Sequence, residues 1–307
     1  MTSLQRRRRR GAATEPTWNE RLVFARTEDG LDLQGLLATP KRDPRADDVL
    51  CLWVHTRQLH FAEAEYVAIA RLVAAAGMPM LTVNTRGQGF GTWFRVENKP
   101  LLAGSAWESF TDCVYDLDAW IDEAAIQGYR KILLVGHGFG GAKVLHFQAQ
   151  RARPEVVGLV LASSGSAVRD KMSEDSIDLA RQMAREGRGR DLMPWGTGGD
   201  SLTSTVSADW YLARAQMYKE LYGHGALPPA LARIRCPLFA WYGADEPKPH
   251  RNVEAFIERM RRTATRAPSF QAMLLKGVGF FYTGSEQTIA RTLIKIHDTV
   301  AGHKTAA

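Results

Sequence analysis

The sequence has few cysteines and no long apolar run, and each shortage excludes a class of protein. Cys51, Cys113 and Cys236 are the three cysteines among 307 residues. Their spacing fits neither a disulfide framework nor a metal-binding cluster, so we expect buried thiols, no metal and no cofactor. No apolar run reaches the roughly 18 residues needed to cross a bilayer, and no apolar stretch follows the N-terminal arginines as a secretory signal requires. We therefore expect a cytoplasmic protein without a membrane span.

Most of the net positive charge of the chain lies in one short N-terminal segment. The formal net charge is +7, and the run Arg6–Arg10 supplies five of these charges, which leaves a net charge of +2 for the rest. A polyarginine tail can hold phosphates or anionic lipid headgroups, but such a run is more often only a solvated tail. We therefore expect no specific nucleic-acid partner. Residues 1–16 hold almost nothing apolar to bury and are predicted to be a disordered tail.

Beyond Trp18 the sequence alternates between strand and helix patterns. The expected strands are Arg21–Arg26, Leu31–Ala38, Asp48–His55, Met80–Asn84, Lys131–Val135, Val156–Ser163, Pro237–Tyr242 and Phe270–Leu275. The expected helices are Ala62–Ala76, Ala106–Gln127, Gly140–Arg151, Asn252–Arg262 and Ser285–Val300. The turn Glu28–Gly30 joins the first two strands as a hairpin. Later strands that alternate with helices predict an α/β fold, with a mostly parallel central sheet covered by helices on both faces.

One interruption in this alternation predicts an inserted cap. Residues 165–234 carry no strand pattern; they contain a polar helical stretch, a glycine-rich segment and a second helix over Ala208–Leu221. We therefore divide the chain into the tail 1–16, a core made of 17–164 and 235–303, and a helical lid over 165–234.

The most informative motif is a glycine-rich turn between a strand and a helix. Ile132–Val135 is apolar and runs directly into Gly136-His137-Gly138-Phe139-Gly140-Gly141. This is the setting of the G-x-S-x-G nucleophile elbow, in which small residues flank a central residue held at strained dihedrals. Gly136 and Gly140 match those flanks. The central position, however, is Gly138, which carries no side chain.

These features resemble the α/β-hydrolase superfamily, and the resemblance extends from about Trp18 to Val300. The loop Val54-His55-Thr56-Arg57 stands where the superfamily has its oxyanion-hole loop, and Arg86-Gly87-Gln88-Gly89 matches its Arg-Gly-x-Gly loop. Tyr242-Gly243-Ala244-Asp245 is similar to the context of the triad acid. The resemblance places the triad histidine in Gly277-Val278-Gly279-Phe280-Phe281-Tyr282, where Phe280 occupies its position.

The resemblance implies a site that retains its acid and lacks its other two catalytic groups. Acyl transfer by this fold needs an oxygen nucleophile whose proton is taken by an oriented imidazole. Gly138 offers no side chain, and Phe280 cannot accept a proton, whereas Asp245 keeps the acid position. His137 beside the vacant nucleophile position is interpreted first as a packing residue. We expect a pseudoenzyme with a degenerate triad, and no conventional serine hydrolase.

A ligand pocket is still predicted at this site. Backbone N–H groups at a helix N-terminus attract a carbonyl oxygen or an anion, so the expected partner is a small hydrophobic molecule that carries a carbonyl or a carboxylate. A homodimer is left open. The residues expected to bind the molecule come from the oxyanion loop, the elbow, the lid, the loop after the fourth strand and the segment before the last helix. They are His55, Thr56, Arg57, Phe139, Trp93, Trp195, Trp210 and Tyr282.

Three functions remain open from the sequence. The first is a binding or structural protein, similar in its defect to the N-myc downstream-regulated family. The second is a cyclase, lyase, isomerase or cofactor-free oxygenase that reuses the pocket for a hydrophobic metabolite. The third is an esterase-like or thioesterase-like hydrolase with a relocated nucleophile.

Overall fold

The computed structural model describes residues 15–97, 99–165, 173–197, 205–222, 229–246 and 253–302. The predicted arginine tail lies almost wholly outside these ranges.

Eight strands form one sheet in the order β1-β2-β4-β3-β7-β8-β9-β10. They are β1 Trp18–Arg26, β2 Asp32–Pro40, β3 Val49–Val54, β4 Met80–Val83, β7 Lys131–His137, β8 Val156–Ala162, β9 Leu238–Gly243 and β10 Phe270–Leu275. The first two strands form an antiparallel hairpin, β2 pairs antiparallel with β4, and every pairing from β4 to β10 is parallel.

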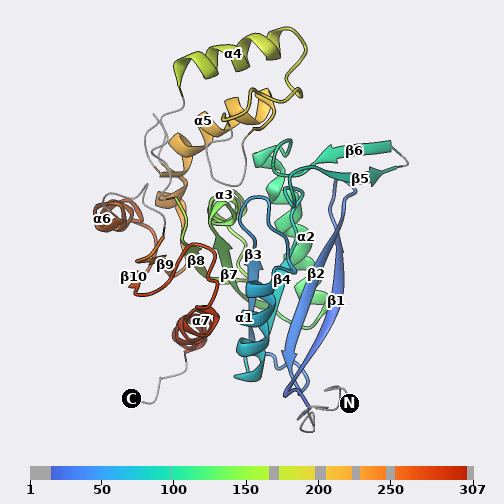
Figure 1. The fold of residues 1–307 in the computed structure, drawn as a ribbon. Coiled ribbons are helices and arrows are strands. Elements are labelled where there is room, and N and C mark those ends of the chain that lie inside the picture. Colours follow the sequence, from blue (N-terminus) through green and yellow to red (C-terminus); the bar gives the residue numbers. More distant parts are fainter. Residues whose placement is uncertain are drawn as a thin grey trace, which may run out of the picture.

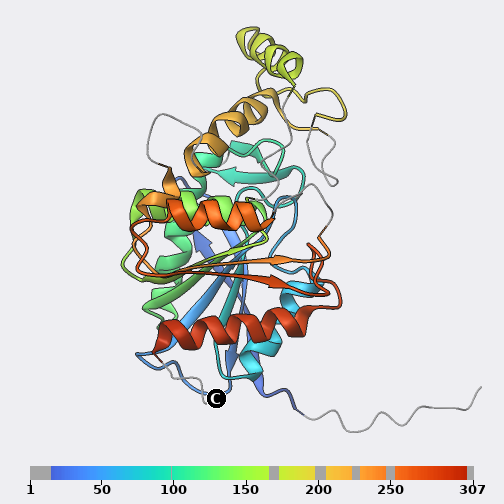
Figure 2. The same ribbon diagram turned by 90° about the vertical axis from the view of Figure 1, so that its left-hand side faces the viewer.

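Helices cover both faces of this sheet (Figures 1 and 2). One face carries α1 and α7, and the other carries α2, α3 and α6. Their bounds are α1 Ala64–Ala75, α2 Cys113–Ile126, α3 Phe139–Arg151, α6 Val253–Thr263 and α7 Glu286–Ala301. The predicted α/β-hydrolase class of fold, with its mostly parallel, doubly covered sheet, is confirmed.

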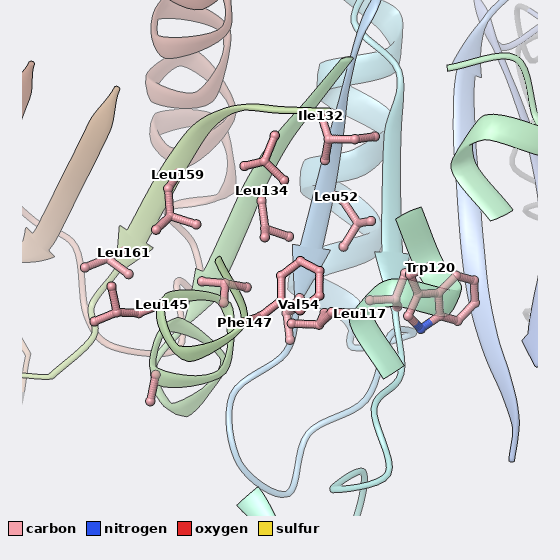
Figure 3. Close-up of a cluster of buried hydrophobic side chains, with 14 of the residues drawn as sticks. Leu52, Val54, Leu117, Trp120, Ile132, Leu134, Leu145, Phe147, Leu159 and Leu161 are labelled. Carbon is pink, nitrogen blue, oxygen red and sulfur yellow. The ribbon is translucent and has the colours of Figure 1, made fainter. Parts of the chain in front are cut away.

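Alternation along β3 and β7 explains why these strands read as continuous apolar runs. Leu52 and Val54 face the core under α2 and α3, whereas Cys51 and Trp53 face the core under α1 and α7. Figure 3 shows the first of these two cores. Because successive side chains point to opposite faces, a strand buried on both faces must be apolar throughout. All three cysteines are free and buried, as expected.

The segment between β8 and β9 contains two further helices, which lie above the end of the sheet where β3 and β7 finish (Figure 1). These are α4 Glu174–Arg185 and α5 Ala208–Tyr222, followed by a 3-10 turn, η2 Ala230–Arg233. Helices α4 and α5 share a small core that includes Met183, Val206 and Trp210. Of the helices in the described ranges, none is long and apolar enough to span a membrane.

Two elements differ from the sequence prediction. A separate hairpin, β5 Thr92–Val96 and β6 Lys99–Ala103, occupies a region expected to be a loop. The helix expected to begin at Ala106 begins instead at Cys113, after a 3-10 turn, η1 Phe110–Asp112. Its first expected turn is replaced because the carbonyl of Gly104 accepts the N–H groups of Trp107 and Glu108 and closes a tight turn.

Candidate functional site

Gly138 lies between β7 and α3 with φ 53° and ψ −116°. Residues that carry a side chain rarely adopt this backbone conformation. Close backbone packing shapes the turn, because a Cβ on Gly136 would overlap the carbonyl group of Gly140. A Cβ on Gly140 would lie 2.5 Å from the carbonyl oxygen of Val54 at the end of β3. The two flanking glycines therefore let the turn pack directly against the oxyanion loop.

The space beside Gly138 is filled by two other side chains. A Cβ at position 138 would overlap Thr56 Oγ1 and would lie 2.8 Å from both Thr56 Cβ and Phe280 Cζ. The same Thr56 Oγ1 accepts a hydrogen bond from the backbone N–H of Phe139, at 3.1 Å. We expected this N–H to be available to a ligand. The structure differs, because Thr56 satisfies the donor.

His137 is completely buried, and both of its ring nitrogens have partners inside the protein. Nε2 donates to the carbonyl oxygen of Phe280 at 2.8 Å, and Nδ1 accepts from the hydroxyl of Tyr66 at 2.6 Å. Burial lowers the pKa of His137 to about 3, so the ring is neutral at physiological pH. These contacts support the packing interpretation of His137: the imidazole ties α1 to the loop before α7.

His55 is held in a similar way on the other side of Thr56. The backbone N–H of Thr85 donates to Nε2 at 3.1 Å, so Nδ1 carries the proton that it donates to the Thr56 carbonyl oxygen at 2.7 Å. Burial lowers its pKa to about 3, with a further contribution from the charge of Lys143. His55 therefore fixes the backbone of Thr56, and its ring nitrogens are not available to a ligand.

The strand end predicted to carry the triad acid holds two carboxylates that point apart. Asp245 is exposed, and its N–H donates to the carbonyl oxygen of Val278 at 3.0 Å. Glu246 is buried, and its carboxylate accepts from the N–H of Gly243 at 2.6 Å. Burial raises the pKa of Glu246, although its hydrogen bonds with Ser163 and Gly243 oppose the shift. Sequence reasoning chose Asp245 from the motif and missed Glu246, whose inward direction only the turn geometry reveals.

Tyr282 has no exposed surface and belongs to the same buried network as Ser163. Its hydroxyl lies 2.9 Å from Ser163 Oγ and accepts from Trp241 Nε1 at 3.0 Å. Its ring centroid lies 4.5 Å from that of His137. The tyrosine therefore packs beneath the site, without a surface that a ligand could reach.

Three predicted ligand-binding residues meet above the elbow. Phe139 is half-buried, and its ring centroid lies 6.0 Å from that of Trp210 on α5. The guanidinium carbon of Arg57, a buried residue, lies 4.2 Å from the centre of the Trp210 ring. Trp93 on the hairpin and Trp195 in the lid are 67% and 83% exposed and do not join this group. Two aromatic rings and a cation thus lie together where α5 packs over the elbow.

A buried ion pair beside the elbow was not anticipated. Lys143 Nζ on α3 lies 2.6 Å from Glu108 Oε2 and donates to Thr85 Oγ1 at 2.8 Å. Both charged side chains have at most 1% of their surface exposed. A lysine inside the otherwise apolar stretch Ala142–Leu145 was the available sequence signal. Among the described residues, no group of His, Cys, Asp and Glu side chains is arranged to hold a metal ion.

The fold and the elbow define the α/β-hydrolase class of protein. A family model described as serine aminopeptidase, S33 (Hydrolase_4), matches residues 48–233, which is more than half of the chain. The chain belongs to this family.

Individual relatives are distant. Phospholipase YtpA of Bacillus subtilis (strain 168) is 23% identical over 154 residues, which are 45% of this chain and 57% of the relative. The structure of Est1E from Butyrivibrio proteoclasticus superposes with a TM-score of 0.62 at 13% identity, covering 92% of this chain and 99% of Est1E. The monoacylglycerol lipase of Paleococcus ferrophilus gives a TM-score of 0.58 at 16% identity, covering 94% and 99% of the two chains. At such identities the structural likenesses establish the fold alone.

Proposed function

We propose that this chain is a non-hydrolysing member of its family, which binds a small hydrophobic molecule carrying a carbonyl or a carboxylate. The observation that carries the proposal is the packing at Gly138. Thr56 and Phe280 together fill the space in which a side chain at position 138 would lie. Thr56 also takes the Phe139 N–H, which is the backbone donor that would stabilise an oxyanion after the nucleophile.

The two histidines beside the elbow, His55 and His137, are committed to internal contacts. A general base must accept a proton and lie within hydrogen-bond reach of the attacking oxygen. His137 and His55 use both ring nitrogens in internal hydrogen bonds, and burial holds the pKa of each at about 3. Phe280 supplies an apolar ring. These contacts support binding without acyl transfer.

The residues above the elbow support a ligand that is apolar at one end and anionic or carbonyl-bearing at the other. Phe139 and Trp210 offer aromatic surface, and the guanidinium carbon of Arg57 lies over the Trp210 ring. A guanidinium group recognises a carboxylate through paired hydrogen bonds, and stacking on an aromatic ring fixes its orientation. Because Thr56 occupies the backbone donor, we assign recognition of the ligand's oxygen to Arg57.

Two measurements on the full chain test this proposal. A fluorophosphonate probe and p-nitrophenyl butyrate should report no activity above background, while titration calorimetry with decanoate should detect binding. The Arg57→Met variant should bind decanoate about tenfold more weakly, since a charged hydrogen bond contributes about 1.5–3 kcal/mol. Arg95→Met, on the exposed face of the hairpin, is the matched control. Labelling by the fluorophosphonate, or no binding of decanoate, would overturn the proposal.

The proposal also makes a specific statement about restoring hydrolysis. Gly138→Ser with Phe280→His should stay inactive on p-nitrophenyl butyrate, because Thr56 still overlaps position 138 and still occupies the Phe139 N–H. Adding Thr56→Gly removes both obstacles and should give weak activity. Equal activity of the double and triple variants would show that Thr56 does not block the site.

A further inference from the structure

One oxygen of the buried ion pair has no hydrogen-bond partner. Glu108 Oε2 accepts from Lys143 at 2.6 Å, whereas Oε1 is buried and unpartnered among the described residues. Leaving a buried acceptor unsatisfied is unfavourable, and more so when the acceptor is charged. Burial raises the pKa of Glu108, and the Lys143 charge opposes that shift. Such an oxygen requires a donor that the described protein does not provide.

A second unpartnered group lies on the same turn. Ser105 Oγ, three residues before Glu108, is buried and has no hydrogen-bond partner in the described part of the chain. The carbonyl of Gly104 accepts the N–H groups of both Trp107 and Glu108, so residues 104–108 form one tight turn. A hydroxyl and a carboxylate oxygen, both without partners, therefore come from one rigid segment.

The fold provides specific space for this carboxylate. A Cβ on Gly87 would overlap the carboxylate atoms of Glu108, so only glycine at position 87 leaves room for the acid. The pair also adjoins the ligand-contacting residues described above. Lys143 Nζ lies 5.5 Å from the centre of the Phe139 ring, and the charge of Arg57 acts on Glu108. Glu108 thus lies beside Arg57 and Phe139, the residues that pack against Trp210 on α5.

We propose that Ser105 and Glu108 form a polar subsite that binds a hydroxyl group of the ligand, so that the natural ligand is a hydroxylated hydrophobic acid or carbonyl compound. A hydroxyl can donate to Glu108 Oε1 and accept from Ser105 Oγ at the same time. An ammonium group fits less well, because Lys143 already neutralises Glu108 and the positive charge of Arg57 lies nearby. This inference rests on the proposed function and adds to it the class of ligand.

A matched pair of probes tests the subsite. The wild-type chain should bind 3-hydroxydecanoate, whose hydroxyl lies near its carboxylate as Glu108 lies near Arg57, about tenfold more tightly than decanoate in titration calorimetry. This is the ratio expected for a hydrogen bond to a buried charged group. In Ser105→Ala this preference for the hydroxylated probe should shrink severalfold. The control is Ser109→Ala, which alters the exposed serine directly after Glu108 and should keep the preference. Thermal unfolding of Ser105→Ala should match the wild type, because the removed hydroxyl has no partner.

The possible outcomes separate the two proposals. If neither probe binds, the proposed function fails. If both bind equally to the wild type, binding stands and the hydroxyl subsite is wrong. A lower unfolding temperature for Ser105→Ala together with equal binding of the two probes would identify Ser105 and Glu108 as the site of a structural water only.

Discussion

Three residues, Thr56, Gly138 and Phe280, determine the packing at the elbow. Each comes from a different loop: the first follows β3, the second follows β7, and the third precedes α7. Sequence motifs identified all three positions, but they could not show that the first and third fill the space beside the second. That contact depends on three loops whose side-chain directions no single stretch of sequence specifies.

Gly138→Ser tests this packing directly. We expect the free energy of unfolding to fall by about 1–3 kcal/mol, because the new side chain overlaps Thr56 and meets Phe280 at a strained backbone position. Thr56→Gly should restore part of this loss, giving a coupling energy that urea unfolding of the two single variants and the double variant can measure. Gly279→Ser is the matched control, since a Cβ there meets nothing within 4 Å. Additive effects of the two substitutions would contradict the contact.

At the scale of elements, long apolar or periodic segments were predictable, and short or charge-dependent ones were not. The strands β3 and β7 and the helix α3 follow from apolar runs and the glycine-rich turn between β7 and α3. The predicted start of α2 was wrong. The residues directly before Cys113 are not α-helical, and Glu108 among them contacts Lys143, which is 35 residues away in sequence. The strands β5 and β6 were missed because neither segment alternates apolar and polar residues.

Loss of one partner of the Lys143–Glu108 pair should lower the free energy of unfolding strongly. Lys143→Met leaves a buried carboxylate without its cation, and we expect a loss of about 3–5 kcal/mol in the free energy of unfolding. Replacing both partners, as Lys143→Met with Glu108→Leu, should recover most of the loss. Lys131→Met, at the exposed start of β7, provides the comparison. A double variant as unstable as Lys143→Met alone would show that charge balance is not the cause.

For the whole molecule, the class of fold could be predicted because strands and helices alternate over nearly the full chain. The arrangement of the lid could not be predicted in the same way, because its contacts depend on where α5 meets α3. Trp195, Trp93 and Trp210 looked alike as aromatic candidates in the sequence. The first two are exposed and only the third packs against Phe139, because tertiary packing selects among equivalent side chains.

The stability of the whole molecule should fall in acid because of two buried histidines. His55 and His137 have ordinary pKa values of 6.5 in the unfolded chain and about 3 in the folded one. Between these values the unfolded state binds protons that the folded state does not, so stability is fully present above 6.5 and is lost as the pH falls toward 3. Each histidine contributes a slope of up to about 1.4 kcal/mol per pH unit.

Urea unfolding at pH 7, 5 and 4 measures this slope. His137→Gln should reduce it by the contribution of one group. An unaltered slope in His137→Gln would mean that this imidazole is already protonated in the folded protein.

The contact between Thr56 and position 138 also constrains the mutational paths open to this chain. A serine at 138 meets Thr56 whenever it arises first, so that step passes through a destabilised protein. Exchange of Thr56 for a smaller residue removes the obstacle in advance and makes the later serine acceptable. The order of the two substitutions therefore decides whether the serine arises in a destabilised or in an accommodating protein.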